Sequence, residues 1–169
     1  MSQKAKVVVV MGSKSDKDSV APCVKLLKEF DVQVETHCLS THRTPDQLTA
    51  LTEALCQEPE TKTIIAAAGM AAALPGAIAA KTIIPVIGLP LSGSALAGKD
   101  ALYAMVQMPS GYPVATVAIN GAKNAALLAL QIVATGNEVV AEQLIDYRDR
   151  LTKDVLDADK IITREYSTS

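Results

Sequence analysis

The sequence predicts an α/β fold of a single domain, with a doubly wound parallel sheet and a long C-terminal helix. Two observations predict it. Short runs of apolar, mostly β-branched residues alternate along the chain with segments whose apolar residues recur at helical spacing. The run at 32–39 alternates with period two, as a half-exposed edge strand does. With this second strand at an edge, the expected strand order is 2-1-3-4-5, as in flavodoxin-like folds.

Five strands are expected in the sheet. They are predicted at residues 6–12, 32–39, 62–68, 84–90 and 113–119. The first contains four consecutive valines, which suits a strand buried on both faces of the sheet. Because parallel strands need long crossover connections, a helix or a helix-containing loop is expected between each pair of successive strands.

The first two helices carry start signals in the sequence. The first is expected to begin after Asp16, or later if Pro22 occupies its first turn. The second is expected to start with Thr44 as its N-cap, Pro45 at its first position and Gln47 at its third. This is a capping-box arrangement, in which the two side chains satisfy the first free N–H groups of the helix.

The C-terminal part of the chain reads as two helices. Residues 123–134 are apolar almost all round, so this helix is expected to be covered by the following helix of the same or a neighbouring subunit. The following helix is longer and amphipathic. Residues 1–158 are therefore expected to form one catalytic domain that includes this helix, and residues 159–169 a flexible tail.

Composition excludes several classes of function. The chain of 169 residues has a formal charge of −2 and no basic stripe, which argues against nucleic acid as a partner. The apolar run near the N-terminus is too short for a signal sequence or a membrane span. Cys23, Cys38 and Cys56 form no metal or redox motif, so they are expected to be buried, reduced thiols of a cytoplasmic protein.

Ligands of such a sheet bind at the carboxyl ends of the strands, which places four loops on the active face. In the first loop, Ser13 precedes a helix start, where backbone N–H groups bind anions. The carboxylate of Asp16 would repel a phosphate, so it better suits ribose hydroxyls or an amine. Ordinary helix capping explains both residues equally well.

The second loop contains one of only two histidines in the chain. His42 has a pKa range suited to proton transfer near neutrality, and Arg43 provides a forked cation suited to phosphate. His37 lies on the polar face of the expected edge strand, so a solvated structural role is favoured for it. The third loop, "GMAAALPG", offers backbone N–H groups and an apolar pocket.

Several blocks of the sequence together resemble the N5-carboxyaminoimidazole ribonucleotide mutase family of purine biosynthesis. They are "VVVMGSKSD", "STHRTPD", "ALPGAIAAKTIIPVIGLP", "ALYAMVQMPSGYPVATVAI" and "KNAALLALQI", in order from about Val7 to Ala134. The resemblance implies a cytoplasmic α/β enzyme that uses no cofactor or metal, acts on a small-molecule ribonucleotide and assembles as a homo-octamer.

The resemblance also implies the reaction and its residues. The family moves a carboxylate from N5 to C4 of the aminoimidazole ring, through loss and recapture of CO2. The histidine of the matching "HRTP" motif, His42 here, is the implied general acid and base. Ser13, Asp16 and Arg43 match positions that bind the ribose phosphate part of the substrate, and Ser40 is a further candidate in the same loop.

The chain departs from the family pattern in the third loop. The family's bacterial mutases usually read "GGAAHLPG", so Ala73 replaces a histidine and Met70 a glycine. A related branch, which carboxylates aminoimidazole ribonucleotide directly with CO2, also has alanine at the position of Ala73. The mutase is the favoured function because the motif around His42 is mutase-like. The direct carboxylase and a nucleotide-binding paralogue without catalysis are the alternatives.

Overall fold

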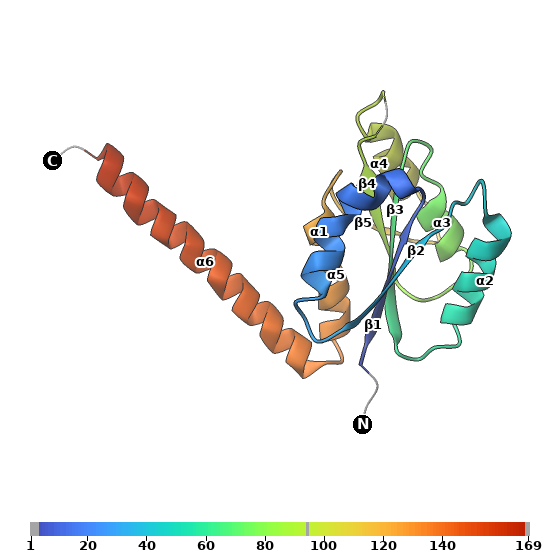
Figure 1. Cartoon of the computed structure of the whole chain (residues 1–169), viewed down its shortest axis with the longest axis horizontal. Coiled ribbons are helices and arrows are strands. Elements are labelled where there is room, and N and C mark those ends of the chain that lie inside the picture. Colours follow the sequence, from blue (N-terminus) through green and yellow to red (C-terminus); the bar gives the residue numbers. More distant parts are fainter. Residues whose placement is uncertain (1–3, 94, 168–169) are drawn as a thin grey trace.

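The computed structural model describes residues 4–93 and 95–167. Its centre is a five-stranded parallel sheet in the order β2-β1-β3-β4-β5, so the predicted fold class and strand order are confirmed (Figure 1). The strands are β1 (Lys6–Met11), β2 (Gln33–Cys38), β3 (Thr61–Gly69), β4 (Val86–Leu91) and β5 (Ala115–Thr116).

Helices cover both faces of the sheet. One face packs against α1, α5 and the beginning of α6, and the other packs against α2, α3 and α4 (Figure 1). The helical elements are the 3₁₀ turn η1 (Lys14–Asp16) and the helices α1 (Lys17–Leu27), α2 (Pro45–Leu55), α3 (Leu74–Ala79), α4 (Lys99–Val106), α5 (Ala122–Ala134) and α6 (Glu138–Tyr166).

The valine run of β1 joins the two halves of the core. Val7 and Val9 belong to the cluster under α1 and α5, whereas Val8 and Val10 belong to the cluster under α2 and α3. All four are at most 1% exposed. Each buried valine contributes roughly 1.5–3 kcal/mol of hydrophobic stabilisation. The strand that carries the first active-face loop is therefore firmly held in the centre of the molecule.

The last strand is shorter than predicted. Residues 113–119 were expected to pair along their length, but only Ala115 and Thr116 form a ladder with β4. Beyond the ladder, the Val117 N–H donates to the Gly88 carbonyl at 3.1 Å. The segment is an edge with a single neighbour, and its first residue is a proline, which cannot donate a ladder hydrogen bond.

The start of the first helix is confirmed, and the capping of the second needs correction. α1 begins at Lys17, immediately after Asp16, so the later start with Pro22 in the first turn does not occur and Pro22 lies inside the helix. Thr44 is the N-cap residue of α2, but its side chain makes no hydrogen bond to an N–H of that helix. Its hydroxyl bonds the backbone of Ser40 instead, because a Thr side chain readily pairs with nearby turn backbone.

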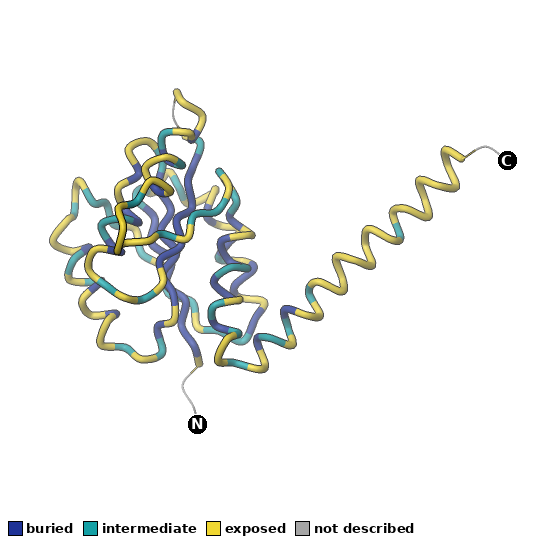
Figure 2. Tube along the Cα trace, turned by 180° about the vertical axis from the view of Figure 1, so that it is seen from behind, coloured by how far each residue is buried: buried dark blue, intermediate teal, exposed yellow. Residues whose placement is uncertain are grey.

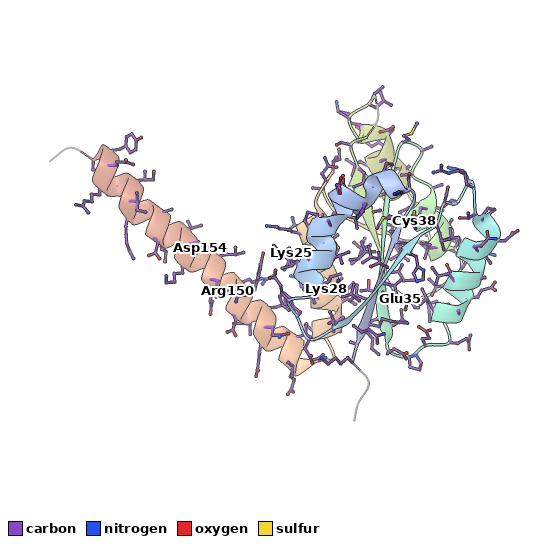
Figure 3. All side chains as sticks on the ribbon, viewed as in Figure 1. Lys25, Lys28, Glu35, Cys38, Arg150 and Asp154 are labelled. Atoms are coloured by element: carbon purple, nitrogen blue, oxygen red, sulfur yellow. The ribbon has the colours of Figure 1, made fainter. Side chains whose placement is uncertain are left out.

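The prediction of three buried thiols is wrong for two of them. Cys23 is buried in α1, whereas Cys38 and Cys56 are exposed. Cys38 ends the edge strand β2 (Figure 3) and Cys56 follows the last turn of α2, positions where one side is open to solvent. Burial raises the pKa of the Cys23 thiol to about 12.

The C-terminal helix is longer than predicted. α6 continues to Tyr166, so the helix does not end at residue 158. Residues 159–166 contain no glycine or proline that would stop a helix. Residues 168–169 lie outside the described residues.

α5 is covered by α1, the sheet and the first turns of α6. Past Tyr147, which still packs against the core, α6 leaves the body of the molecule as an exposed arm (Figures 1 and 2). Among the described helices, none combines the length and apolar character that a membrane crossing needs.

Candidate active site

One cavity opens at the carboxyl ends of the parallel strands, the edge at which a doubly wound sheet binds ligands. Its volume is about 590 Å³. Four segments line it: the start of α1 with the loop after β1, the turn between β2 and α2, the segment between β3 and α3, and the end of β4. All five residues predicted from the sequence line this cavity, namely Ser13, Asp16, Ser40, His42 and Arg43.

The segment after β1 offers hydroxyl and carboxylate groups to the cavity. Ser13 caps η1, and its Oγ accepts hydrogen bonds from the Ser15 N–H at 3.3 Å and the Ser15 hydroxyl at 2.9 Å. The Asp16 N–H donates to the Ser13 carbonyl at 3.1 Å. Asp16 Oδ2 lies 3.8 Å from the position that a Cβ would take at Gly12, so the carboxylate lies close to the end of β1.

Asp16 is half-buried, and burial raises the pKa of its carboxyl group above the usual value. Hydrogen bonds from the Ser13 backbone and the Ser15 hydroxyl, and the charge of Arg43, oppose that rise. The charge of Arg43 therefore acts on the same space as Asp16, although the two side chains come from different loops. A partly desolvated carboxylate here favours hydroxyl or amine donors on a ligand.

Residues 40–44 form a tight turn that is fixed at both ends. The Thr44 N–H donates to the Ser40 carbonyl at 2.8 Å, and the Thr44 hydroxyl donates to the same carbonyl at 3.1 Å. Thr44 Oγ1 also accepts from the Ser40 N–H at 2.8 Å, and the Arg43 N–H donates to Ser40 Oγ at 3.3 Å. The three middle residues of the turn are thereby held against the cavity.

His42 and Arg43 are exposed on this turn. Within the part of the chain that the structure describes, neither side chain has a hydrogen-bond partner, so both are available to a ligand. His37 differs, because its Nε2 lies 2.6 Å from Oε1 of Glu35 and it does not line the cavity. An imidazole without a protein partner can donate and accept protons at the cavity. A guanidinium without a partner can bind an anion through two N–H groups.

The segment after β3 provides an apolar wall with one strained residue. Met70 has a φ of 57°, in the left-handed region that side chains other than glycine rarely adopt, and it is 64% exposed. Tight backbone hydrogen bonds follow, from the Ala72 N–H to the Met70 carbonyl at 2.9 Å and from the Ala73 N–H to the Ala71 carbonyl at 2.6 Å. The part of this wall from Ala68 to Leu74 carries no titratable side chain, whereas His42 and Asp16 lie on other segments of the cavity.

Two lining residues were missed by the sequence reasoning. Thr41 lines the cavity between Ser40 and His42, and Ser19 reaches it from the first turn of α1. The position of Thr41 between two candidate residues was a signal that could have found it. Ser19 lies three positions after Asp16, a spacing that puts both on one side of a helix start.

Among residues 4–93 and 95–167, no three His, Cys, Asp or Glu side chains are grouped so that they could hold a metal ion. The hydroxyl groups and the guanidinium suit a ligand with hydroxyl and phosphate groups instead. That the reaction uses no cofactor stays a prediction from the resemblance.

The fold and the cavity define a class of protein: a doubly wound α/β protein with a cavity of ligand size at the carboxyl ends of its strands, lined by an imidazole and a guanidinium. The comparisons with known proteins narrow this class. The chain belongs to the AIR carboxylase family, which it matches over residues 6–154.

Relatives of known sequence carry a more specific name. The chain is 47% identical over 159 residues to the N5-carboxyaminoimidazole ribonucleotide mutase of Haemophilus influenzae, a match that covers 93% of this chain and 96% of the relative. It is also 47% identical to the mutase of Pyrococcus abyssi, over 88% of this chain and 84% of the relative. Among solved structures, Treponema denticola PurE is 25% identical and superposes with a TM-score of 0.86, covering 98% of this chain and all of the other.

Proposed function

We propose that this chain is an isomerase that moves a carboxylate from N5 to C4 of the aminoimidazole ribonucleotide ring in purine biosynthesis. The observation that carries the proposal is the cavity, which joins His42 to Ser13, Asp16 and Arg43 in a chain 47% identical to a mutase over nearly its whole length. The family supports the reaction, and the geometry supports a role for each residue.

The substrate's ribose phosphate is assigned to the loop after β1 and to Arg43. The Arg43 guanidinium has no protein partner among the described residues and suits a phosphate, which it can bind with two N–H groups. Ser13 and Ser40 add hydroxyl groups at the two sides of the cavity. Asp16 accepts from the ribose hydroxyls, because its negative charge disfavours the phosphate itself.

His42 is assigned both proton transfers of the reaction. In the first step, the bond between N5 and its carboxylate breaks, CO2 leaves, and N5 takes a proton from the His42 imidazolium. In the second step, C4 attacks CO2, a carbon–carbon bond forms, and the neutral imidazole removes the C4 proton. His42 ends in the state in which it began, so a single imidazole is sufficient and the alanine at position 73 leaves no step without a proton carrier.

The apolar wall after β3 is assigned the retention of CO2 between the two steps. Its side chains from Ala68 to Ala73 are methyl groups apart from Gly69 and Met70, so they offer water no strong hydrogen-bond partner. Water kept out of this space cannot hydrate CO2 before it is recaptured.

A second candidate function is direct carboxylation of aminoimidazole ribonucleotide by CO2. The observation that favours it is the same wall, since Ala73 stands where the mutases carry a second imidazole and the direct carboxylases carry alanine. The mutase is preferred because the relatives at 46–47% identity carry that name.

The arm formed by α6 supports assembly with further copies of the chain, and the cytoplasm is the location that the resemblance implies. Large apolar side chains are exposed along it, including Leu151, Val155, Leu156, Ile161 and Ile162. A single chain would leave these groups in water, so they are expected to be covered by neighbouring subunits. The number of copies, eight, comes from the resemblance, and light scattering of the purified protein tests it.

The proposed function is tested with two substrates at the same pH. The purified protein is incubated with N5-carboxyaminoimidazole ribonucleotide, and separately with aminoimidazole ribonucleotide plus CO2, and formation of the C4-carboxylated product is followed. Turnover of the first substrate alone is expected. Turnover of the second alone would establish the carboxylase, and turnover of neither would leave only the nucleotide-binding paralogue.

A further inference from the structure

Thr41 carries an unusual polar atom. Among the described residues, its Oγ1 is the only buried side-chain nitrogen or oxygen without a hydrogen-bond partner. Buried hydroxyl groups in proteins nearly always have a partner, because a desolvated hydroxyl without one destabilises the fold. Thr41 also lines the cavity, directly before His42. An unsatisfied hydroxyl at this place points to a partner that arrives with the ligand.

The other hydroxyl groups of the same turn already have partners. Ser40 Oγ accepts from the Arg43 N–H, and Thr44 Oγ1 both accepts from and donates to the Ser40 backbone. These bonds shape the turn and leave Thr41 without a structural task for its hydroxyl. Thr41 is therefore the member of the turn whose hydroxyl is free to serve a ligand.

Rotation about one bond of the Thr41 side chain would move this hydroxyl. The Thr41 residue as a whole is half-buried, although its Oγ1 is covered. A threonine has its hydroxyl and its methyl group on the same carbon, so rotation about the Cα–Cβ bond moves the hydroxyl into a different staggered position with no movement of the backbone. The backbone of the turn stays fixed by its bonds between Ser40 and Thr44.

The charges that line the cavity indicate which ligand group the Thr41 hydroxyl meets. Arg43 is the only lysine or arginine among the described residues that line the cavity, and the proposed function assigns it to the phosphate. The substrate carries a second anion, its carboxylate, at the reacting end. The side chains of the wall beyond it are methyl groups and the Met70 thioether, so a hydroxyl donor beside His42 suits the carboxylate.

We propose that the Thr41 hydroxyl donates a hydrogen bond to the carboxylate of the substrate and of the product, and holds it beside His42. This inference rests on the proposed function, whose reacting group it positions. It makes Thr41 a binding and positioning residue: it carries no proton in the reaction and fixes the carboxylate where the imidazole acts.

Binding of two ligands that differ only in the carboxylate tests the proposal. Titration calorimetry measures the affinity of the wild-type protein and of Thr41→Val and Thr41→Ser for 4-carboxyaminoimidazole ribonucleotide and for aminoimidazole ribonucleotide. Valine keeps the shape and removes the hydroxyl, whereas serine keeps the hydroxyl. Thr41→Val is expected to bind the carboxylated ligand about tenfold more weakly and the carboxylate-free ligand unchanged, because one hydrogen bond to a charged group is lost. Thr41→Ser is expected to bind both ligands as the wild-type protein does.

A thermal melt of the free proteins gives a second readout that does not use the ligand. Thr41→Val removes an unsatisfied buried hydroxyl, so its melting temperature is expected to equal or exceed that of the wild-type protein. A lower melting temperature would show that the hydroxyl has a structural partner and would overturn the proposal.

The failure of this proposal differs from failure of the proposed function. Normal binding of both ligands by Thr41→Val, or equal weakening of both, overturns the role of Thr41 and leaves the mutase in place. If the wild-type protein binds neither ribonucleotide, the proposed function itself fails, and the role of Thr41 fails with it.

Discussion

The two histidines lie close together in the sequence, but their surroundings differ in kind. His37 belongs to a group in which every charge has a partner, which we call the Lys6 cluster: Lys6, Glu35, His37 and Glu58. Lys6 Nζ donates to Glu35 Oε2 at 2.9 Å, and His37 Nε2 lies 2.6 Å from Glu35 Oε1. Lys6 Nζ also contacts the Glu58 carboxylate. Glu35 is labelled in Figure 3. His42 stands in a turn whose three central side chains have no hydrogen-bond partner among residues 4–93 and 95–167.

The difference teaches what each region is for. Paired charges satisfy one another, so the Lys6 cluster has reached its final state without a ligand and stabilises the edge of the sheet. The cavity at the carboxyl ends of the strands is lined by an imidazole and a guanidinium with no hydrogen-bond partner among the described residues, by the unsatisfied hydroxyl of Thr41 and by the strained backbone of Met70. The unsatisfied hydroxyl and the strained backbone are unfavourable, and such features persist at a site where a ligand compensates for them.

The largest effect is expected from His42→Asn. Asparagine keeps the approximate size but cannot carry a proton, so turnover should fall by roughly 10²–10⁴-fold while ligand binding is retained. Steady-state kinetics and product titration measure the two quantities. His37→Asn is the matched control and should retain wild-type turnover. Wild-type turnover by the His42→Asn variant would remove the basis of the comparison.

Arg43→Ala should mainly weaken binding. Loss of a two-pronged contact to a phosphate is expected to raise the dissociation constant of aminoimidazole ribonucleotide about tenfold to a hundredfold. Arg43→Lys keeps the charge but not the fork, so its dissociation constant should fall between those of the wild-type protein and Arg43→Ala. An unchanged dissociation constant in Arg43→Ala would mean that the phosphate is bound elsewhere.

Lys6→Met should destabilise the fold and leave ligand binding intact. Lys6 is 3% exposed, and its removal leaves two carboxylates without their cation, at a cost of about 1–2 kcal/mol in the free energy of unfolding. Urea unfolding measures this loss. Lys4→Met is the control, because the Lys4–Asp31 pair is exposed and should contribute little.

The pH dependence of the Lys6 cluster has a defined sign. Hydrogen bonding from Lys6, and then from His37, holds the pKa of Glu35 below its ordinary 4.5. A lowered folded pKa means stabilisation that is present above pH 4.5 and lost as the pH falls through the folded value. Burial lowers the pKa of Lys6, but its bonds with Glu58 and Glu35 outweigh burial and raise the pKa above its ordinary 10.5. The stabilisation that comes from the Lys6 charge is therefore lost only as the pH rises through this raised pKa. The difference between wild type and Lys6→Met should therefore shrink in acid.

The smallest effect is expected from the backbone of Met70. Met70→Gly relieves the left-handed conformation, whereas Met70→Ala keeps a Cβ there. The glycine variant should be more stable than the alanine variant by about 1 kcal/mol, measured by urea unfolding. If the alanine variant is the more stable one, the loop is not strained at this position.

The strand order, and the meeting of the candidate residues at one cavity, could be predicted from the sequence because each rests on a local signal. The period-two run of β2 identified the edge strand, and the order of the strands then fixed which loops meet. This is why Ser13 and His42, which come from different loops, were expected in one cavity, and both line it.

The features that the sequence could not predict depend on contacts. Thr44 is the N-cap residue of α2 as expected, but its hydroxyl bonds Ser40 rather than the helix, an alternative that capping rules do not distinguish. The unsatisfied state of the Thr41 hydroxyl could not be predicted, because nothing in a sequence shows that a hydroxyl will be buried without a partner. The extent of α6 was underestimated, since its exposed apolar residues have no partner within the described chain to define an end.

The central claim is that the cavity at the carboxyl ends of the strands is where the carboxylate is transferred. A crystal structure of the protein with 4-carboxyaminoimidazole ribonucleotide tests it most directly. The account predicts the phosphate at Arg43 and Ser13, and the carboxylate between Thr41 and His42. A ligand bound outside this cavity, for example in the space of about 550 Å³ between α1 and α6, would contradict it.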